Sequence, residues 1–198
     1  MNTKDFSKCE LVSILEAIEL STNCWSEEHL RQLMVRTKEL VGADYSICAL
    51  GTVPQRGGAE VLSLINGDYP EEWVGIYTKE DLYKIDPVVR FHGRFCGTQL
   101  WGDTFRRYTD AEAKQVINRA SDFGLYYGIS SGVSIPDTDI ASIFSFGGAK
   151  DIFTDRQKKV VDVVTLHLHK AFVRICREKV ESMVEMGGEG PALEQSLQ

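Results

Sequence analysis

The longest periodic segment of the chain, from Phe153 past Val180, limits the fold more than any other feature. Thr154 and Gln157 stand three residues apart at its start, as in a helix capping box. Apolar residues then recur at helical spacing, at Val160, Val161, Val164, Leu168, Phe172, Ile175 and Cys176. One face of this predicted helix must therefore be covered by something else.

Four runs upstream of this helix have the alternation and the β-branched content of strands. They are Tyr45–Leu50, Val61–Ile65, Gly128–Ile135 and Ile140–Phe146. Pro54, Gly57 and Gly58 favour a long loop between the first two runs. Pro136-Asp137-Thr138-Asp139 carries typical turn residues between the last two. We therefore predict two hairpins.

The remaining periodic segments predict helices that flank these hairpins. The first forty residues indicate two helices, the second capped by Ser26 and running over Glu27–Val41. Pro70–Tyr77 and Asp86–His92 are short helices with a proline near the start, and a helix from Thr109 or Asp110 to Phe123 stops at Gly124. The sum is an α/β fold, a three-layer α-β-α sandwich with a central, mainly antiparallel five-stranded sheet.

Length and charge limit the domain organisation and the partners. The 198 residues, 43% of them hydrophobic, fit one domain over residues 1–186, followed by a flexible tail over 187–198 that begins with glycines. The 29 acidic residues exceed the 22 basic ones, whereas a nucleic-acid-binding domain usually has a basic face, so we expect no direct nucleic-acid binding. The sequence shows no signal peptide and no membrane span, which predicts a cytoplasmic protein.

A concentration of large amphipathic side chains between Tyr69 and Trp101 is the main functional signal. Tyr69, Trp73 and Tyr77 repeat every four residues and so share one helical face, and Asp86 follows. An indole only donates, a phenol donates and accepts, and a carboxylate accepts, so this set could bind a neutral head group with two carbonyls and one N–H. Aromatics at this spacing are also typical of ordinary core, and an aspartate before a proline is typical of a helix cap.

The same residues, in the same order, resemble the autoinducer-binding domain of the LuxR family of quorum-sensing transcriptional regulators. The matching segments are Asn66-Gly67-Asp68-Tyr69-Pro70-Glu71-Glu72-Trp73, Tyr77, Ile85-Asp86-Pro87-Val88-Val89, Trp101, Ala120-Ser121-Asp122-Phe123-Gly124, Gly132-Val133-Ser134-Ile135-Pro136 and Phe144-Ser145-Phe146. The resemblance covers about Glu28 to Glu178 and is greatest to regulators of conjugal plasmid transfer. It implies a sandwich like that of GAF and PAS domains.

The resemblance also implies a ligand, an N-acyl homoserine lactone autoinducer, and a role for each polar residue. Asp86 would accept from the amide N–H of the ligand, and the Trp73 indole would donate to the lactone carbonyl. Tyr69 would contact the acyl carbonyl, and the hydroxyl of Ser145 would bond the same region. No other cofactor is implied.

The rest of the predicted binding residues are ring and apolar contacts. Tyr77 and Trp101 would pack on the ligand mainly through their rings. Ala49, Leu50 and Ile143, with Val88, would contact the acyl tail. Tyr126 and Tyr127, in a stretch that is longer here than in relatives, either contact the ligand or only lengthen a loop.

Members of this family normally carry a C-terminal helix-turn-helix domain, which this sequence lacks. Residues 187–198 are too few for a core of their own. The chain is either a shortened regulator or a natural single-domain protein that would pair with full-length regulators or act as a ligand sink. We expect a homodimer, or a heterodimer with a full-length regulator. The apolar face of the Phe153–Val180 helix either forms that dimer surface or packs on the sheet.

Two other function classes are alternatives. His167 and His169 resemble a metal-binding pair, but two residues apart on a helix they point about 200° apart, which does not suit a shared ion. Asp86 and His92 could form an acid/base pair, yet no nucleophile motif or phosphate-binding loop accompanies them. We therefore expect neither an enzyme, such as a lactone hydrolase, nor a metal site. The second alternative is a sensor of the same fold for a different small molecule.

Overall fold

The computed structural model describes residues 6–52 and 60–186 of the chain. Its middle layer is a five-stranded antiparallel sheet with the order β2-β1-β5-β4-β3. The strands are β1 (Tyr45–Thr52), β2 (Glu60–Asn66), β3 (Gln99–Leu100), β4 (Tyr127–Ser134) and β5 (Ile140–Gly148). The predicted fold class is confirmed. The loop predicted around Pro54, Gly57 and Gly58 and the tail predicted over 187–198 lie outside the described residues.

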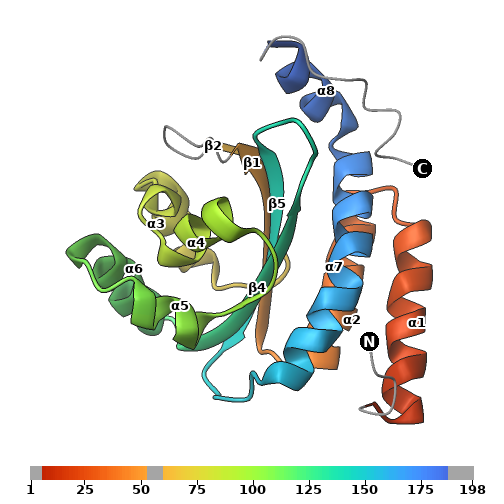
Figure 1. Ribbon diagram of the computed structural model, residues 1–198, viewed down its shortest axis with the longest axis horizontal. Helices are drawn as coiled ribbons and strands as arrows, with labels where there is room; N and C mark the ends of the chain where they lie inside the picture. The colour runs from red at the N-terminus through yellow and green to blue at the C-terminus, as the bar shows by residue number, and fades with distance from the viewer. Residues whose placement is uncertain (1–5, 53–59, 187–198) are drawn as a thin grey trace.

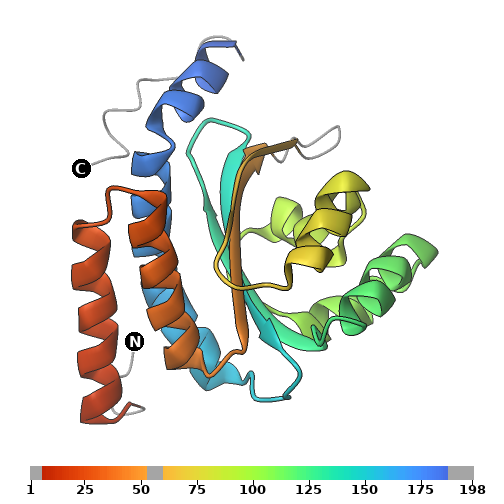
Figure 2. The ribbon, with the colours of Figure 1, turned by 180° about the vertical axis from the view of Figure 1, so that it is seen from behind.

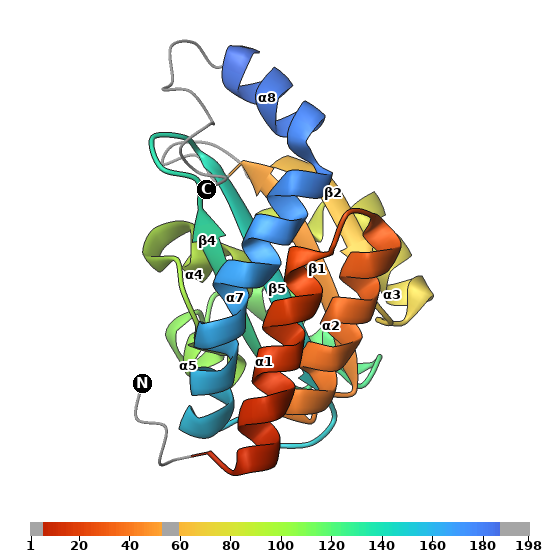
Figure 3. The same cartoon turned by 90° about the vertical axis from the view of Figure 1, so that its right-hand side faces the viewer.

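Helices cover both faces of this sheet (Figures 1 and 2). One face carries α2 (Glu27–Val41) and α7 (Asp155–Ile175), and the other carries α3 (Glu71–Lys79), α4 (Pro87–Phe95), α5 (Trp101–Arg107) and α6 (Ala111–Ser121). The first helix, α1 (Lys8–Thr22), packs mainly on α2 and α7 and forms an outer addition to the three layers (Figure 3). Within the described ranges, no helix combines the length and the apolar character needed to cross a membrane.

The register of the central strand β5 decides which side chains share a face. Ser145 pairs with Ile47 on β1 and with Ser130 on β4, and Ile143 pairs with Ala49 on β1. Cross-strand partners point to the same side, and residues next to them point to the other. The alternate residues, among them Cys48, Leu50, Phe144 and Phe146, belong to the core beneath α2 and α7.

The predicted long helix is two helices. It begins at Asp155 with the predicted capping box of Thr154 and Gln157, but it ends at Ile175, and α8 (Arg177–Met186) follows after Cys176 leaves the helical conformation. The predicted apolar stripe is buried within the chain, against the sheet, α1 and α2. Intramolecular packing therefore covers this stripe, and a dimer contact through the outer positions of the helix stays a prediction.

Local prediction missed the shortest elements. Strand β3 has two residues, too few to show an alternation, and α5 has seven. Helix α6 is capped by Asp110, whose carboxylate accepts from the Ala113 N–H at 3.0 Å, and ends at Ser121, before the predicted end at Phe123. Tyr127 belongs to β4, and the exposed side chains of Tyr126 and Tyr127 do not line the cavity described below.

Candidate functional site

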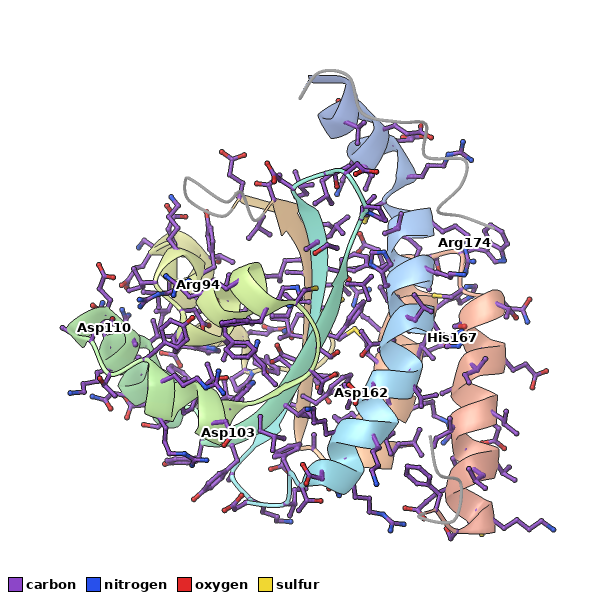
Figure 4. The ribbon with its side chains drawn as sticks, in the orientation of Figure 1. Arg94, Asp103, Asp110, Asp162, His167 and Arg174 are labelled. Carbon is purple, nitrogen blue, oxygen red and sulfur yellow. The ribbon has the colours of Figure 1, made fainter. Side chains whose placement is uncertain are left out.

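A cavity of about 140 Å³ lies between the sheet and the helices α3 to α6. By the same measure one buried water needs about 10 to 15 Å³, so the space suits a small organic molecule. Figure 4 shows the side chains that converge from these helices toward the sheet. All nine predicted ligand-binding residues border this cavity: Ala49, Tyr69, Trp73, Tyr77, Asp86, Val88, Trp101, Ile143 and Ser145.

Helix α3 directs its aromatic face into the cavity. Trp73 and Tyr77 are one turn apart, their ring centroids lie 5.5 Å from each other, and Trp73 is 4% exposed. Phe123, after α6, also packs on the indole, at 5.6 Å between centroids. The Trp73 indole is therefore held in one orientation at the cavity wall.

Tyr69 enters the cavity from the loop before α3. The side chain of Asn66 fixes this loop, because its Oδ1 accepts from the Tyr69 N–H at 2.8 Å and its Nδ2 donates to the Tyr69 carbonyl at 3.0 Å. The Tyr69 ring lies edge-on to Tyr45, with the centroids 6.1 Å apart. Burial raises the pKa of Tyr69 well above its usual value, so its hydroxyl remains protonated.

Asp86 is both a helix cap and part of the cavity wall. Its Oδ1 accepts from the Val88 N–H at 2.7 Å, at the start of α4, and its Oδ2 accepts from the Tyr77 hydroxyl at 2.8 Å. Desolvation raises the pKa of Asp86, and the hydrogen bonds from Tyr77 and Val88 oppose that rise. The sequence left cap and ligand contact as alternatives, but the geometry allows both. Tyr77, predicted to act mainly through its ring, also fixes the Asp86 carboxylate.

Trp101 lies over a part of the sheet that only glycines allow it to approach. A Cβ at Gly128 would lie 2.5 Å from Cδ2 of Trp101, and a Cβ at Gly147 would lie 2.7 Å from its Cη2. The indole Nε1 donates to Oγ of Ser130 at 2.8 Å, and Oγ of Ser130 is 2.7 Å from Oγ of Ser145. Hydrogen bonds thus connect Trp101 through Ser130 to Ser145, which is a predicted site residue.

Sequence reasoning missed Ser130, although a signal for it existed. The indole N–H only donates, so Oγ of Ser130 accepts from Trp101, and the hydrogen bond between Ser130 and Ser145 can run in either direction. When Ser130 donates to Ser145, the Ser145 proton is available to a molecule in the cavity. The period of two along β4 places Ser130 on one face, but only the pairing of β4 with β5 shows that Ser145 is its neighbour.

Two buried side-chain polar atoms in the described part of the chain lack a hydrogen-bond partner: Oη of Tyr69 and Nδ1 of His92. Both residues border the cavity. A buried polar group without a partner costs about 1 to 3 kcal/mol. A bound molecule with matching polar atoms would remove that cost at two points of the wall.

The rest of the wall is mostly apolar. Ala49, Val88 and Ile143 occupy it as predicted, and further lining residues are Ile47, Leu64, Val74, Val89, Phe105, Val116, Ile117 and Leu125. Leu50, also predicted to face the ligand, borders the cavity too, although its side chain belongs to the core under α2 and α7 because it alternates with Ala49 along β1. Polar groups at Tyr69, Asp86 and Ser145 with an otherwise apolar wall suit an amphipathic ligand.

The histidines of the possible metal pair lie on α7, across the sheet from the cavity (Figure 4 labels His167). Nδ1 of His169 is hydrogen-bonded to Oγ of Ser142 at 2.8 Å, and desolvation lowers its pKa to about 4. Among residues 6–52 and 60–186, no group of three or more His, Cys, Asp or Glu side chains could hold a metal ion.

Comparison with known proteins assigns the family. Residues 26–172, about three quarters of the chain, match the family described as the autoinducer binding domain. The chain belongs to this family. The resemblance to the ligand-sensing domains of LuxR-type quorum-sensing regulators, predicted from the segments around Tyr69 to Trp101, is confirmed.

Individual relatives of this autoinducer-binding domain are distant. The HTH-type quorum sensing-dependent transcriptional regulator RpaR of Rhodopseudomonas palustris is 25% identical over 150 residues, which are 74% of this chain and 60% of RpaR. This chain thus spans about 60% of the length of that regulator.

Two solved structures share the fold. CepR2 of Burkholderia cenocepacia, an N-acylhomoserine lactone dependent LuxR family transcription factor, matches with a TM-score of 0.66 at 13% identity, over 86% of this chain and 98% of that chain. SdiA, known from Escherichia coli, has been solved in complex with octanoyl-rac-glycerol. That complex matches with a TM-score of 0.58 at 18% identity, over 93% of this chain and 69% of that chain.

Proposed function

We propose that this autoinducer-binding domain encloses an N-acyl homoserine lactone in the cavity between the sheet and α3 to α6. The observation that carries the proposal is the position of Tyr69, Trp73 and Asp86 around one apolar cavity. An acyl homoserine lactone has one amide N–H, an acyl carbonyl and a lactone carbonyl, followed by an apolar tail. The cavity wall offers an acceptor for the N–H, donors for the two carbonyls and apolar side chains for the tail.

The head group would be bound by residues that are already oriented. Tyr77 and Val88 hold the Asp86 carboxylate, which keeps lone pairs for the amide N–H of the ligand. The Trp73 indole would donate to the lactone carbonyl. The unpartnered hydroxyl of Tyr69 would donate to the acyl carbonyl, and the Ser145 hydroxyl would do so as well when it accepts from Ser130.

The tail would supply much of the affinity by burial. Each methylene removed from water contributes about 0.8 kcal/mol. Ala49, Val88 and Ile143 are the predicted contacts, and Leu64, Phe105 and Leu125 extend the apolar wall.

A second candidate is a sensor for another acyl compound with a polar, uncharged head. The SdiA complex with octanoyl-rac-glycerol favours it, since that protein has the same fold. The hydroxyls of Tyr69 and Ser145 suit an ester head group too. Asp86 separates the two candidates. An ester has no amide N–H to donate to this carboxylate, and a glycerol hydroxyl could donate in its place only with a different geometry.

We further propose that the domain works within a quorum-sensing transcriptional regulator, or against one as an antagonist. In either case it would be a cytoplasmic ligand sensor and not an enzyme, and it would form a homodimer or pair with a full-length regulator. With net charge −7, the chain itself would not bind nucleic acid; a partner or a further domain would do so.

Thermal unfolding with a panel of compounds tests the proposal. A ligand at about 100 times its dissociation constant adds about 2.7 kcal/mol to the free energy of unfolding. We expect the melting temperature to rise with acyl homoserine lactones and to rise less with the matching monoacylglycerols. Chromatography of the recovered lactone should show it intact. A larger rise with monoacylglycerols would favour the second candidate, and an opened lactone would favour a hydrolase.

A further inference from the structure

His92 lies in the cavity wall with one ring nitrogen paired and the other not. Val88 and His92 are one turn apart on α4, and both border the cavity. His92 is 4% exposed. The ring can approach the sheet because β4 has a glycine, Gly132, at this point. A Cβ at Gly132 would lie 2.6 Å from Cε1 and 2.8 Å from Nε2 of His92. This position is therefore built to hold an imidazole ring.

The hydrogen bonds of this ring decide its protonation. His92 bonds the backbone carbonyl of Ser142, and the ring nitrogen on that side is Nε2, which lies against Gly132 as that carbonyl does. A carbonyl only accepts, so Nε2 carries the hydrogen. Burial lowers the pKa of His92 to about 4, so the ring is neutral near pH 7 and Nδ1 is an acceptor. Nδ1 is the atom that has no partner among the described residues.

The described residues around the ring supply no donor for Nδ1. From α4 itself, Cys96 places its Sγ 3.9 Å from Nε2, on the other side of the ring, and donates to the Gly132 carbonyl at 3.3 Å. The sheet contributes the Ser142 carbonyl and the backbone of Gly132. Since the protein satisfies Nε2 and leaves Nδ1 buried and unpaired, the missing partner is a donor that enters with the ligand.

The location of His92 separates it from the head-group residues. It is six residues beyond Asp86 along α4, or about 9 Å at the rise of an α-helix. On the facing sheet, Gly132 is two residues beyond Ser130, or about 7 Å along the strand. Both distances run away from the atoms that would bind the amide and the acyl carbonyl. They exceed the reach of a substituent on the third carbon of the acyl group.

We propose that the acyl group of the cognate ligand carries a hydroxyl beyond its third carbon, and that Nδ1 of His92 accepts the hydrogen bond from it. This inference rests on the proposed function, because it takes the lactone head at Asp86 as its reference point. His92 would then set specificity for the tail, where the other wall residues provide only apolar contact. An unsubstituted acyl tail would leave the acceptor buried without a partner.

The test measures affinity for one series of synthetic acyl homoserine lactones of equal acyl length. The parent has no substituent, and each other member carries a single hydroxyl on one carbon from the third to the last. For the wild type, we expect a hydroxyl at one position beyond the third carbon to tighten binding by about tenfold, or about 1.4 kcal/mol. Calorimetric titration gives the dissociation constants.

His92→Phe, His92→Gln and a matched control complete the design. Phe keeps a ring but has no acceptor, so the hydroxylated compound should lose its advantage over the parent, whereas the Gln carbonyl should retain part of it. His169→Gln is the control, because His169 also bonds Ser142 but lies on the other face of the sheet, and the advantage should persist. The parent measured with each variant cancels general effects on the fold.

The outcomes separate this inference from the proposed function. If the parent binds as tightly as every hydroxylated compound, or if the advantage survives in His92→Phe, the role of His92 is wrong while the lactone proposal stands. If no member of the series binds the wild type, the lactone proposal itself fails.

Discussion

The hydroxyl of Tyr77 donates a 2.8 Å hydrogen bond to Oδ2 of Asp86, while the Val88 N–H donates to Oδ1. Two elements, α3 and α4, thereby fix one carboxylate at the cavity wall. The carboxylate can accept further hydrogen bonds, so it is oriented for a ligand N–H before any ligand arrives.

Tyr77→Phe should weaken lactone binding about three- to tenfold, because a hydrogen bond of this kind contributes about 0.5 to 1.5 kcal/mol and the ring contacts remain. Calorimetric titration measures the change. Tyr108→Phe is the control, since Tyr108 is buried but does not line the cavity. Equal affinity of wild type and Tyr77→Phe would mean that this hydroxyl does not orient Asp86 for binding.

Asp86→Ser should abolish most lactone binding with little effect on α4. Serine retains a side-chain oxygen for the Val88 N–H, so the helix cap persists, but the carboxylate that would accept from the ligand amide is lost. We expect affinity to fall at least about a hundredfold, which corresponds to about 2.7 kcal/mol. Asp110→Ser makes the same change at the cap of α6, outside the cavity, and should leave affinity unchanged. Similar losses in both variants would point to the caps alone.

Trp73→Phe should weaken binding about tenfold or more, because it removes the only donor of the indole and keeps an aromatic ring. The matched change is Trp25→Phe. Trp25 is 68% exposed and stacks with the Arg174 guanidinium away from the cavity, so its replacement should not affect the ligand. Binding curves for both variants decide the point, and a Trp73→Phe protein with wild-type affinity would remove the indole from the head-group assignment.

Gly128→Ala should destabilise the domain by about 1 to 3 kcal/mol, because the new Cβ would lie 2.5 Å from Trp101 and displace its ring from Ser130. Chemical denaturation measures the free energy of unfolding. Gly75→Ala in α3 meets nothing within 4 Å and should stabilise the helix by about 0.5 to 1 kcal/mol. A stable Gly128→Ala protein would show that the Trp101 ring moves without cost.

Acid should destabilise the domain between pH 6.5 and about 4. The pKa values of buried His92 and His169 are lowered from 6.5 to about 4, so in this window the unfolded chain binds protons that the folded chain does not. Stability contributed by the neutral rings is present above pH 6.5 and is lost as the pH falls toward 4, by about 3 kcal/mol for each histidine.

Denaturation curves of His169→Gln at several pH values check this expectation. The loss of stability between pH 6.5 and 4 should be smaller than in the wild type, because Gln does not titrate there. The same pH dependence in both proteins would contradict the assignment to His169.

Much of the site could be predicted from the sequence because its signals are local. The four-residue repeat placed Trp73 and Tyr77 on one face of α3, and Asp86 before Pro87 indicated a helix start. Resemblance to a family supplied the roles that spacing left open. Ser130 was missed, and His92 was considered only as part of an acid/base pair, because the relevant partners, Ser145 and Gly132, are distant in sequence.

The sequence by itself determined the longer elements and the face that each one buries, because periods of 3.6 and 2 follow from backbone geometry alone. It also determined the chemistry available at α3 and α4. Only the tertiary structure decided which faces meet. The order of strands sets Ser145 beside Ser130, the two-residue strand β3 exists only because β4 lies next to it, and the glycines of β4 and β5 admit the rings of His92 and Trp101. Such contacts depend on packing between distant segments, which a local sequence pattern does not show. The cavity, with the unpaired Tyr69 hydroxyl and Nδ1 of His92, results from that packing.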